Sequence, residues 1–107
     1  MPDLPRLFTA GPLDDWDARR LADVAKAITA PARVQILALI AARPDMCAGE
    51  VMRALGTLTQ PTISHHLDVL TEAGLVIRRP DGQYVRYTVD RDGVTDLSLA
   101  LWPRRLR

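Results

Sequence analysis

The segment that most constrains this chain covers residues 59–73, TQPTISHHLDVLTEA, and Gly74 follows it directly. Ile63, Leu67 and Leu70 recur at three- and four-residue steps, so all three fall on one face of an α-helix. Threonine is a typical N-cap, proline is tolerated in a first helical turn, and glycine commonly follows a helix end. The sequence therefore predicts a helix over this segment, with one packed face and one exposed face.

The exposed face of this predicted helix is small, uncharged and rich in hydrogen-bonding groups. Gln60 lies at its N-terminal end, and His65 lies opposite the packed face. Thr62 and Ser64 flank the outer side. His65 and His66 are adjacent and therefore diverge, which makes them a poor metal-chelating pair. Because glutamine can pair with adenine and hydroxyls can contact several base edges, the pattern favours reading of DNA.

A shorter helix is predicted just upstream, over residues 48–55, with Gly56 ending it. The three residues GTL then lead to the next helix, which is a helix-turn-helix pattern in outline. After Gly74 the alternation becomes that of a strand. The stretches LVIRRP and QYVRYTV, joined by the turn residues DG, predict a two-stranded hairpin. The order of elements is typical of a winged helix-turn-helix fold, mainly α with a small β-hairpin.

Three further helices are predicted, which brings the total to five. One begins at about Asp14, one begins near Pro31, and the last covers residues 92–101. The inner stripe of the helix that begins near Pro31 is expected to consist of Val34, Leu37, Ile40 and Ala41.

At 107 residues the chain is expected to form one domain over residues 13–102, with a flexible arm at 1–12 and a basic tail at 103–107. Its net charge of +1 is too small to indicate a nucleic-acid partner by itself. Cys47 is the only cysteine, so no internal disulfide can form. No apolar run approaches the roughly 20 residues that span a bilayer, and the N-terminus lacks a signal-peptide pattern. A cytoplasmic protein with no membrane partner is therefore expected.

The first and last predicted helices each carry an apolar stripe that a chain this small cannot easily cover internally. A two-fold homodimer would bury both stripes, although packing within one chain remains the alternative. The residues of this predicted interface are Trp16, Leu21, Val24, Ile28, Val94, Leu97, Leu101 and Trp102.

The segment LTQPTISHHLDVLTEAGLVIRRPDGQYVRYTV resembles the ArsR-type (ArsR/SmtB-like) family of bacterial winged-helix repressors, and APARVQILALI is similar to the helix before it. The resemblance covers about residues 18–101. It implies a homodimer, formed by the first and last helices, that binds an inverted-repeat operator and represses transcription until an inducer weakens DNA binding. Carried onto this sequence, the residues facing DNA would be Gln60, Thr62, Ser64 and His65 of the helix and Arg78, Arg79 and Gln83 of the wing.

The sequence departs from the family's metal sites. Soft-metal sensors of the family usually carry a cysteine pair before the recognition helix, but here Gly49 stands where the partner of Cys47 would be. One thiolate cannot form the site that soft metals prefer. Another metal site known in the family uses acids and histidines on the last helix. Here that helix has no histidine and offers only the acids Asp90, Asp92 and Asp96. We therefore expect no cofactor and no thiophilic metal, with a non-standard carboxylate site left open. The signal would come from a separate partner protein, a small ligand at the dimer interface, or oxidation of Cys47.

An enzyme and a protein-contact module are the alternatives to DNA binding. An enzyme would need a nucleophile with a base in reach, but Cys47 and His65 lie on different predicted helices with no evident third member. We therefore expect no catalytic residues. A winged helix that contacts only proteins stays open, because the net charge is close to zero.

Overall fold

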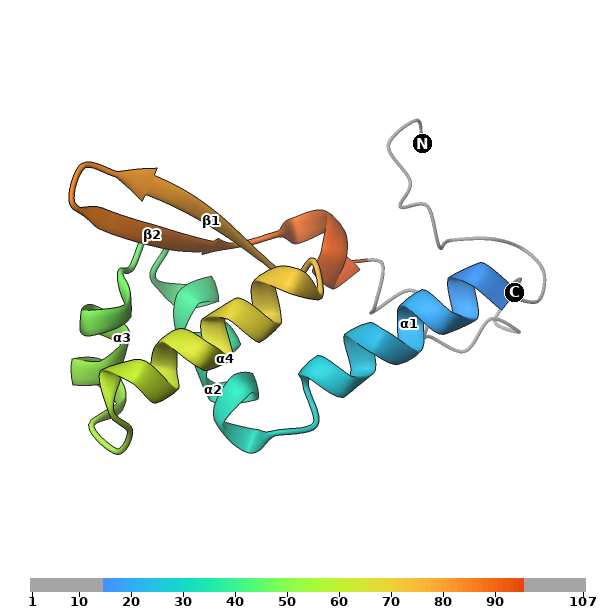
Figure 1. Ribbon diagram of the computed structural model, residues 1–107, viewed down its shortest axis with the longest axis horizontal. Helices are drawn as coiled ribbons and strands as arrows, with labels where there is room; N and C mark the ends of the chain where they lie inside the picture. The colour runs from blue at the N-terminus through green and yellow to red at the C-terminus, as the bar shows by residue number, and fades with distance from the viewer. Residues whose placement is uncertain (1–14, 96–107) are drawn as a thin grey trace.

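The computed structural model describes residues 15–95, so the predicted arm at 1–12 and tail at 103–107 lie outside the described range. Figure 1 shows α2, α3 and α4 gathered beneath a long β-hairpin, while α1 extends away from them. A helical segment at 91–95 follows the hairpin. The elements are α1 (Asp15–Ala27), α2 (Pro31–Ala42), α3 (Ala48–Leu55), α4 (Gln60–Glu72), β1 (Val76–Asp81) and β2 (Tyr84–Val89).

The core lies between α2, α3, α4 and the base of the hairpin. Ile63, Leu67 and Leu70 of α4 are fully buried, which confirms the packed face predicted from their spacing. Each such side chain stabilises the fold by about 1.5–3 kcal/mol relative to exposure. The other side chains buried to the same degree are Ile36, Ile40, Val51 and Leu75.

The predicted inner stripe of α2 was wrong in part. Val34 is 48% exposed, whereas Ile36 is fully buried beside Ile40. The helix sequence PARVQILALIAA is apolar on almost every side, so its pattern marks no exposed face. Packing against α4 and the hairpin selects the face instead.

Local signals set the ends of α3 and α4 as predicted. Gly56 ends α3 in the left-handed conformation with φ 73°, which glycine adopts without steric cost. Thr59 is the N-cap of α4, and its hydroxyl oxygen accepts a hydrogen bond from the Thr62 amide at 3.4 Å. The short connection holds the two helices as a helix-turn-helix pair.

The hairpin β1–β2, called the wing below, is antiparallel with Val76 opposite Val89 and Asp81 opposite Tyr84. The two-residue turn is therefore Gly82–Gln83, one position later than the predicted turn at Asp81 and Gly82. Gly82 has φ 61°, and a glycine at the first turn position suits a type II′ turn. This turn keeps Asp81 in the strand.

The last helical segment begins beside the connection between α4 and β1. The Asp90 carboxylate accepts hydrogen bonds from the amides of Asp92 and Gly93 at 3.1 and 3.3 Å, so Asp90 caps the segment. The Asp90 amide donates to the Leu75 carbonyl oxygen at 2.9 Å. This backbone hydrogen bond therefore fixes where the segment starts relative to α4 and β1.

Helices α1 and α2 meet at a sharp corner of 92°. Within residues 15–95, no single helix is long and apolar enough to cross a membrane, and only this bent pair together reaches the required length and composition. The corner places α1 beside the C-terminal end of α4, where Arg20 and Val24 share a surface hollow with Ala73.

Candidate nucleic-acid interface

A groove of about 580 Å³ lies between α3, α4 and the wing. It brings together four of the residues predicted to face DNA: Gln60 and Ser64 from α4, and Arg78 and Gln83 from the wing. We call this surface the α4–wing groove. Its other lining residues are Cys47, Ala48, Gly49, Arg53, Asp68, Tyr84, Val85 and Tyr87.

Helical spacing explains the α4 side of the groove. Gln60, Ser64 and Asp68 are four residues apart, so their side chains share one face of the helix. Asp68 was absent from the predicted set, although its spacing from Ser64 could have identified it. Arg53 of α3 was also absent from the predicted set, although it lines the groove. Arg53 and Gln60 both approach Gly49: a Cβ built on Gly49 would lie 3.5 Å from the Arg53 guanidinium and 3.7 Å from the Gln60 side-chain oxygen.

Two predicted α4 residues lie outside the lining of this groove. The Thr62 hydroxyl is 3.0 Å from the Thr59 hydroxyl, so it takes part in capping the helix. His65 is exposed, with its ring centroid 5.9 Å from that of His66. The predicted contact set is therefore divided between the groove and the outer side of α4.

The wing arginines point to opposite faces of the hairpin. Arg78 pairs with Tyr87 across the strands, and Tyr87 is buried, so Arg78 shares the inner face that lines the groove. Arg79 pairs with Arg86, and its guanidinium binds the Asp45 carboxylate at 3.2 Å. Among residues 15–95, Arg78 has no hydrogen-bond or ion-pair partner, so its charge is available to a ligand.

Arg86 ties the middle of the wing to α3. Its guanidinium binds Asp81 of the same hairpin and Glu50 of α3, each at 3.2 Å. The Tyr87 amide adds a 2.9 Å hydrogen bond to the Met46 carbonyl oxygen. These contacts hold the wing at a set angle to the helix-turn-helix.

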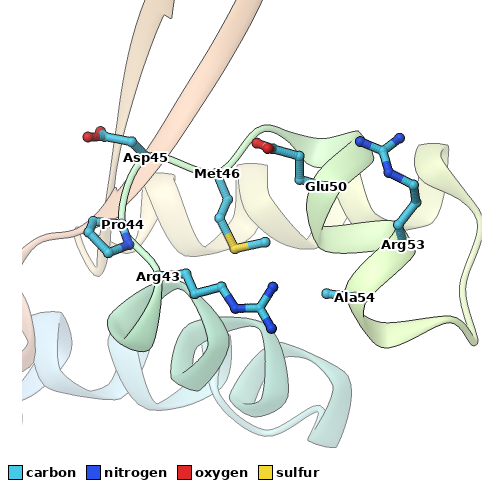
Figure 2. Close-up of a pocket in the computed structure, with 7 residues that line it drawn as sticks. All are labelled: Arg43, Pro44, Asp45, Met46, Glu50, Arg53 and Ala54. Carbon is cyan, nitrogen blue, oxygen red and sulfur yellow. The ribbon is translucent and has the colours of Figure 1, made fainter.

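A second hollow, of about 540 Å³, lies where α2 passes into α3 (Figure 2). Its two acids already bind wing arginines, Asp45 with Arg79 and Glu50 with Arg86. Its remaining lining residues, Arg43, Pro44, Met46, Arg53 and Ala54, include no nucleophile. The hollow therefore anchors the wing and offers no arrangement for covalent catalysis.

Comparison with known proteins identifies the family. The family model "Bacterial regulatory protein, arsR family" matches residues 30–78, from the start of α2 into β1. An HTH-type transcriptional regulator from Methanocaldococcus jannaschii is 37% identical over 78 residues, which cover 73% of this chain and 86% of that protein. The chain belongs to the ArsR family.

Other relatives agree with this assignment. The transcriptional repressor SdpR of Bacillus subtilis is 34% identical, with coverage of 69% of this chain and 80% of SdpR. A homodimeric winged helix-turn-helix DNA-binding domain from Mycobacterium bovis is 31% identical, with a TM-score of 0.67 and coverage of 83% of this chain and 82% of that domain. These similarities confirm the predicted family and the winged helix-turn-helix fold.

The described residues of this ArsR-family chain do not fit a soft metal ion. Cys47 is the N-cap of α3: its sulfur accepts from the Glu50 amide, and its own amide donates to the Glu50 carboxylate at 3.0 Å. Gly49 supplies no second thiolate. Among residues 15–95, no three side chains of histidine, cysteine, aspartate or glutamate gather closely enough to hold a metal.

The predicted dimer residues are only partly described. Val24 is 8% exposed and belongs to the core of the single chain, and Ile28 and Val94 pack against that core. Leu21 is half-buried on α1. The side chain of Trp16 and the residues Leu97, Leu101 and Trp102 lie outside the described part of the chain.

Proposed function

We propose that this protein is a homodimeric, sequence-specific DNA-binding repressor that binds an inverted-repeat operator. The observation that carries the proposal is the α4–wing groove, in which Gln60 and Ser64 lie opposite Arg78 and Gln83. A relative supports this role, because SdpR is a transcriptional repressor.

The two sides of the groove supply different kinds of contact. Gln60 and Ser64 project from the N-terminal half of α4, which suits base edges in a major groove. Arg78 and Gln83 line the groove from the wing, which suits contacts with a neighbouring phosphate backbone. Thr62, His65 and Arg79 complete the proposed contact surface from outside the groove lining.

The Mycobacterium bovis domain supports the homodimer, since it is homodimeric and shares this fold. In this chain α1 extends away from the other helices (Figure 1), so its outer side is accessible to a second copy. A two-fold dimer would present two α4 helices to half-sites about one DNA turn, roughly 34–36 Å, apart. A DNA-binding repressor acts where the chromosome is, so we place the protein in the cytoplasm.

The signal that releases DNA is proposed to differ from that of soft-metal sensors. The family resemblance matches Cys47 to the first thiolate of such sensors, and in this chain Cys47 caps α3 together with Glu50. A partner protein, a small ligand at the dimer interface or oxidation of Cys47 therefore remains the proposed input. A titration with zinc, nickel and cadmium tests this, because tight stoichiometric binding would contradict it.

Fluorescence anisotropy with DNA from upstream of the protein's own gene tests DNA binding. We expect the protein to bind the upstream DNA at least about 10³-fold more tightly than random DNA. Its affinity should fall steeply between about 50 mM and about 200 mM salt. Equal affinity for both DNAs would contradict sequence specificity. Absence of binding to either DNA at low salt would support the alternative of a protein-contact module.

A further inference from the structure

The Arg33 side chain joins three helices. It projects from the first turn of α2, and its Nε donates a 2.5 Å hydrogen bond to the Ala27 carbonyl oxygen at the end of α1. Its Nη1 lies 3.3 Å from Nδ1 of His66 on α4. Arg33 and His66 are both half-buried, so water competes less with these contacts than it does at the surface.

The contact with Ala27 completes the C-terminus of α1. The last carbonyls of a helix lack intrahelical donors and need partners from elsewhere. The Ile28 amide donates to the Ala25 carbonyl oxygen, and the Thr29 amide and hydroxyl both donate to the Lys26 carbonyl oxygen. Arg33 supplies the donor for Ala27 from across the 92° corner between α1 and α2. The corner is therefore fixed by a side chain as well as by the backbone.

The contact with His66 requires a neutral imidazole. A guanidinium only donates hydrogen bonds, so Nδ1 of His66 must accept, with the ring proton on Nε2. Burial lowers the pKa of His66, and the charges of Arg33 and His65 lower that pKa further. The accepting form is therefore present at neutral pH, and acid removes it.

Other charged groups surround the contacts that Arg33 makes with Ala27 and His66. Asp23 and Lys26 of α1 and Glu72 of α4 line a hollow together with Arg33. His65 of α4 is the other titratable neighbour, with its ring centroid 5.9 Å from that of His66. Of these helices, α1 belongs to the proposed dimer interface and α4 to the proposed DNA interface.

We propose that Arg33 is a positioning residue that sets α1 against α4 through Ala27 and His66, and thereby sets the spacing of the two half-sites that the dimer accepts. The inference rests on the proposed function, because it needs a dimer that binds two half-sites. His66 is next to the DNA-facing stretch of α4. A shift in the contacts of Arg33 with Ala27 and His66 therefore changes the direction of α4 relative to the dimer interface.

The test separates half-site binding from recognition of spacing. Arg33→Ala and His66→Ala are compared with the unmodified protein on a single half-site and on full operators whose spacer is lengthened or shortened by one or two base pairs. Loss of a hydrogen bond to a charged group predicts that discrimination among spacers falls by about tenfold. Half-site affinity is expected to stay within about twofold, because the contact residues of the groove remain. Lys26→Ala is the matched control at the same corner and should keep the original discrimination.

A pH series supplies the second readout. As pH falls through the lowered pKa of His66, protonation should remove the acceptor and relax the spacer preference of the unmodified protein. His66→Gln keeps an accepting oxygen without titrating, so it should hold its preference at low pH. If Arg33→Ala fails to fold by circular dichroism, His66→Ala and His66→Gln decide the matter.

The outcomes for the two proposals differ. If the unmodified dimer binds no operator, the proposed function fails. If it binds and distinguishes spacers, but Arg33→Ala and His66→Ala distinguish them equally well, the positioning role is overturned.

Discussion

Gly93 passes so close to Gly74 that a Cβ added to Gly93 would lie 1.9 Å from the Gly74 carbonyl oxygen. The neighbour is backbone, so it cannot move aside as a flexible side chain would. Gly93→Ala should therefore lower the free energy of unfolding by about 1–3 kcal/mol, as overpacking does in other tight sites. Urea denaturation followed by circular dichroism measures the change.

A second glycine provides the control for that substitution. A Cβ on Gly49 would meet its nearest neighbours at 3.5 and 3.7 Å, which is ordinary contact. Because Gly49 lies in helix α3, Gly49→Ala should leave stability unchanged or raise it by about 0.4–1 kcal/mol. Equal destabilisation by both substitutions would contradict the close approach at Gly93.

Truncation of the α4 side of the groove should affect sequence choice. Ser64→Ala and Gln60→Ala are each expected to weaken operator binding by roughly 1–3 kcal/mol and to relax base preference at the contacted position. Anisotropy titrations on the operator and on single-base variants measure both effects. An unchanged preference at every base would argue against base contacts from this face.

The two neighbouring wing arginines should behave differently. Arg78 lines the groove without a partner among residues 15–95, whereas Arg79 is shared with Asp45. Arg78→Ala should weaken binding to all sequences and reduce the slope of log affinity against log salt by about 1. Arg79→Ala should act in the same direction by a smaller amount. A larger effect from Arg79→Ala would place the phosphate contact on the other face of the wing.

The Glu50 carboxylate should make stability depend on pH. A hydrogen bond from the Cys47 amide is the main cause that lowers the pKa of Glu50, and the charges of Arg86 and Arg53 add to it. A lowered folded-state pKa stabilises the protein above the unfolded-state pKa, and this contribution is lost as pH falls through the folded-state value. Glu50→Gln should therefore be less stable than the unmodified protein at neutral pH, with the difference shrinking below about pH 4. Denaturation series across this range test the sign.

Substitution of Cys47 separates its role as the N-cap of α3 from the reactivity of its thiol. Cys47 is the N-cap of α3, and serine is a preferred residue at that position. Cys47→Ser should thus keep or raise the melting temperature while removing the thiol. DNA release by peroxide should disappear in this variant if oxidation of Cys47 is the signal. Peroxide release that persists would remove the redox hypothesis.

Much of the fold could be predicted because its signals act within a few residues. The N-cap Thr59, the left-handed Gly56 and the spacing of Ile63 with Leu67 each work inside one helix or its end. The structure places α3 at Ala48–Leu55, as its sequence predicts, and the wing differs by a single turn position. The local sequence thus determined the order of elements, the helix-turn-helix and the polar face of α4.

Tertiary structure alone decided which faces and charges meet. The apolar sequence of α2 does not distinguish Ile36 from Val34, and packing buries only the first. Arg79 and Asp45 are 34 residues apart, and Arg33 and His66 are 33 apart, so no local period links them. A helical or strand pattern records what one element prefers by itself. The partners of a side chain depend on how separate elements pack, and that is settled only when the whole core closes.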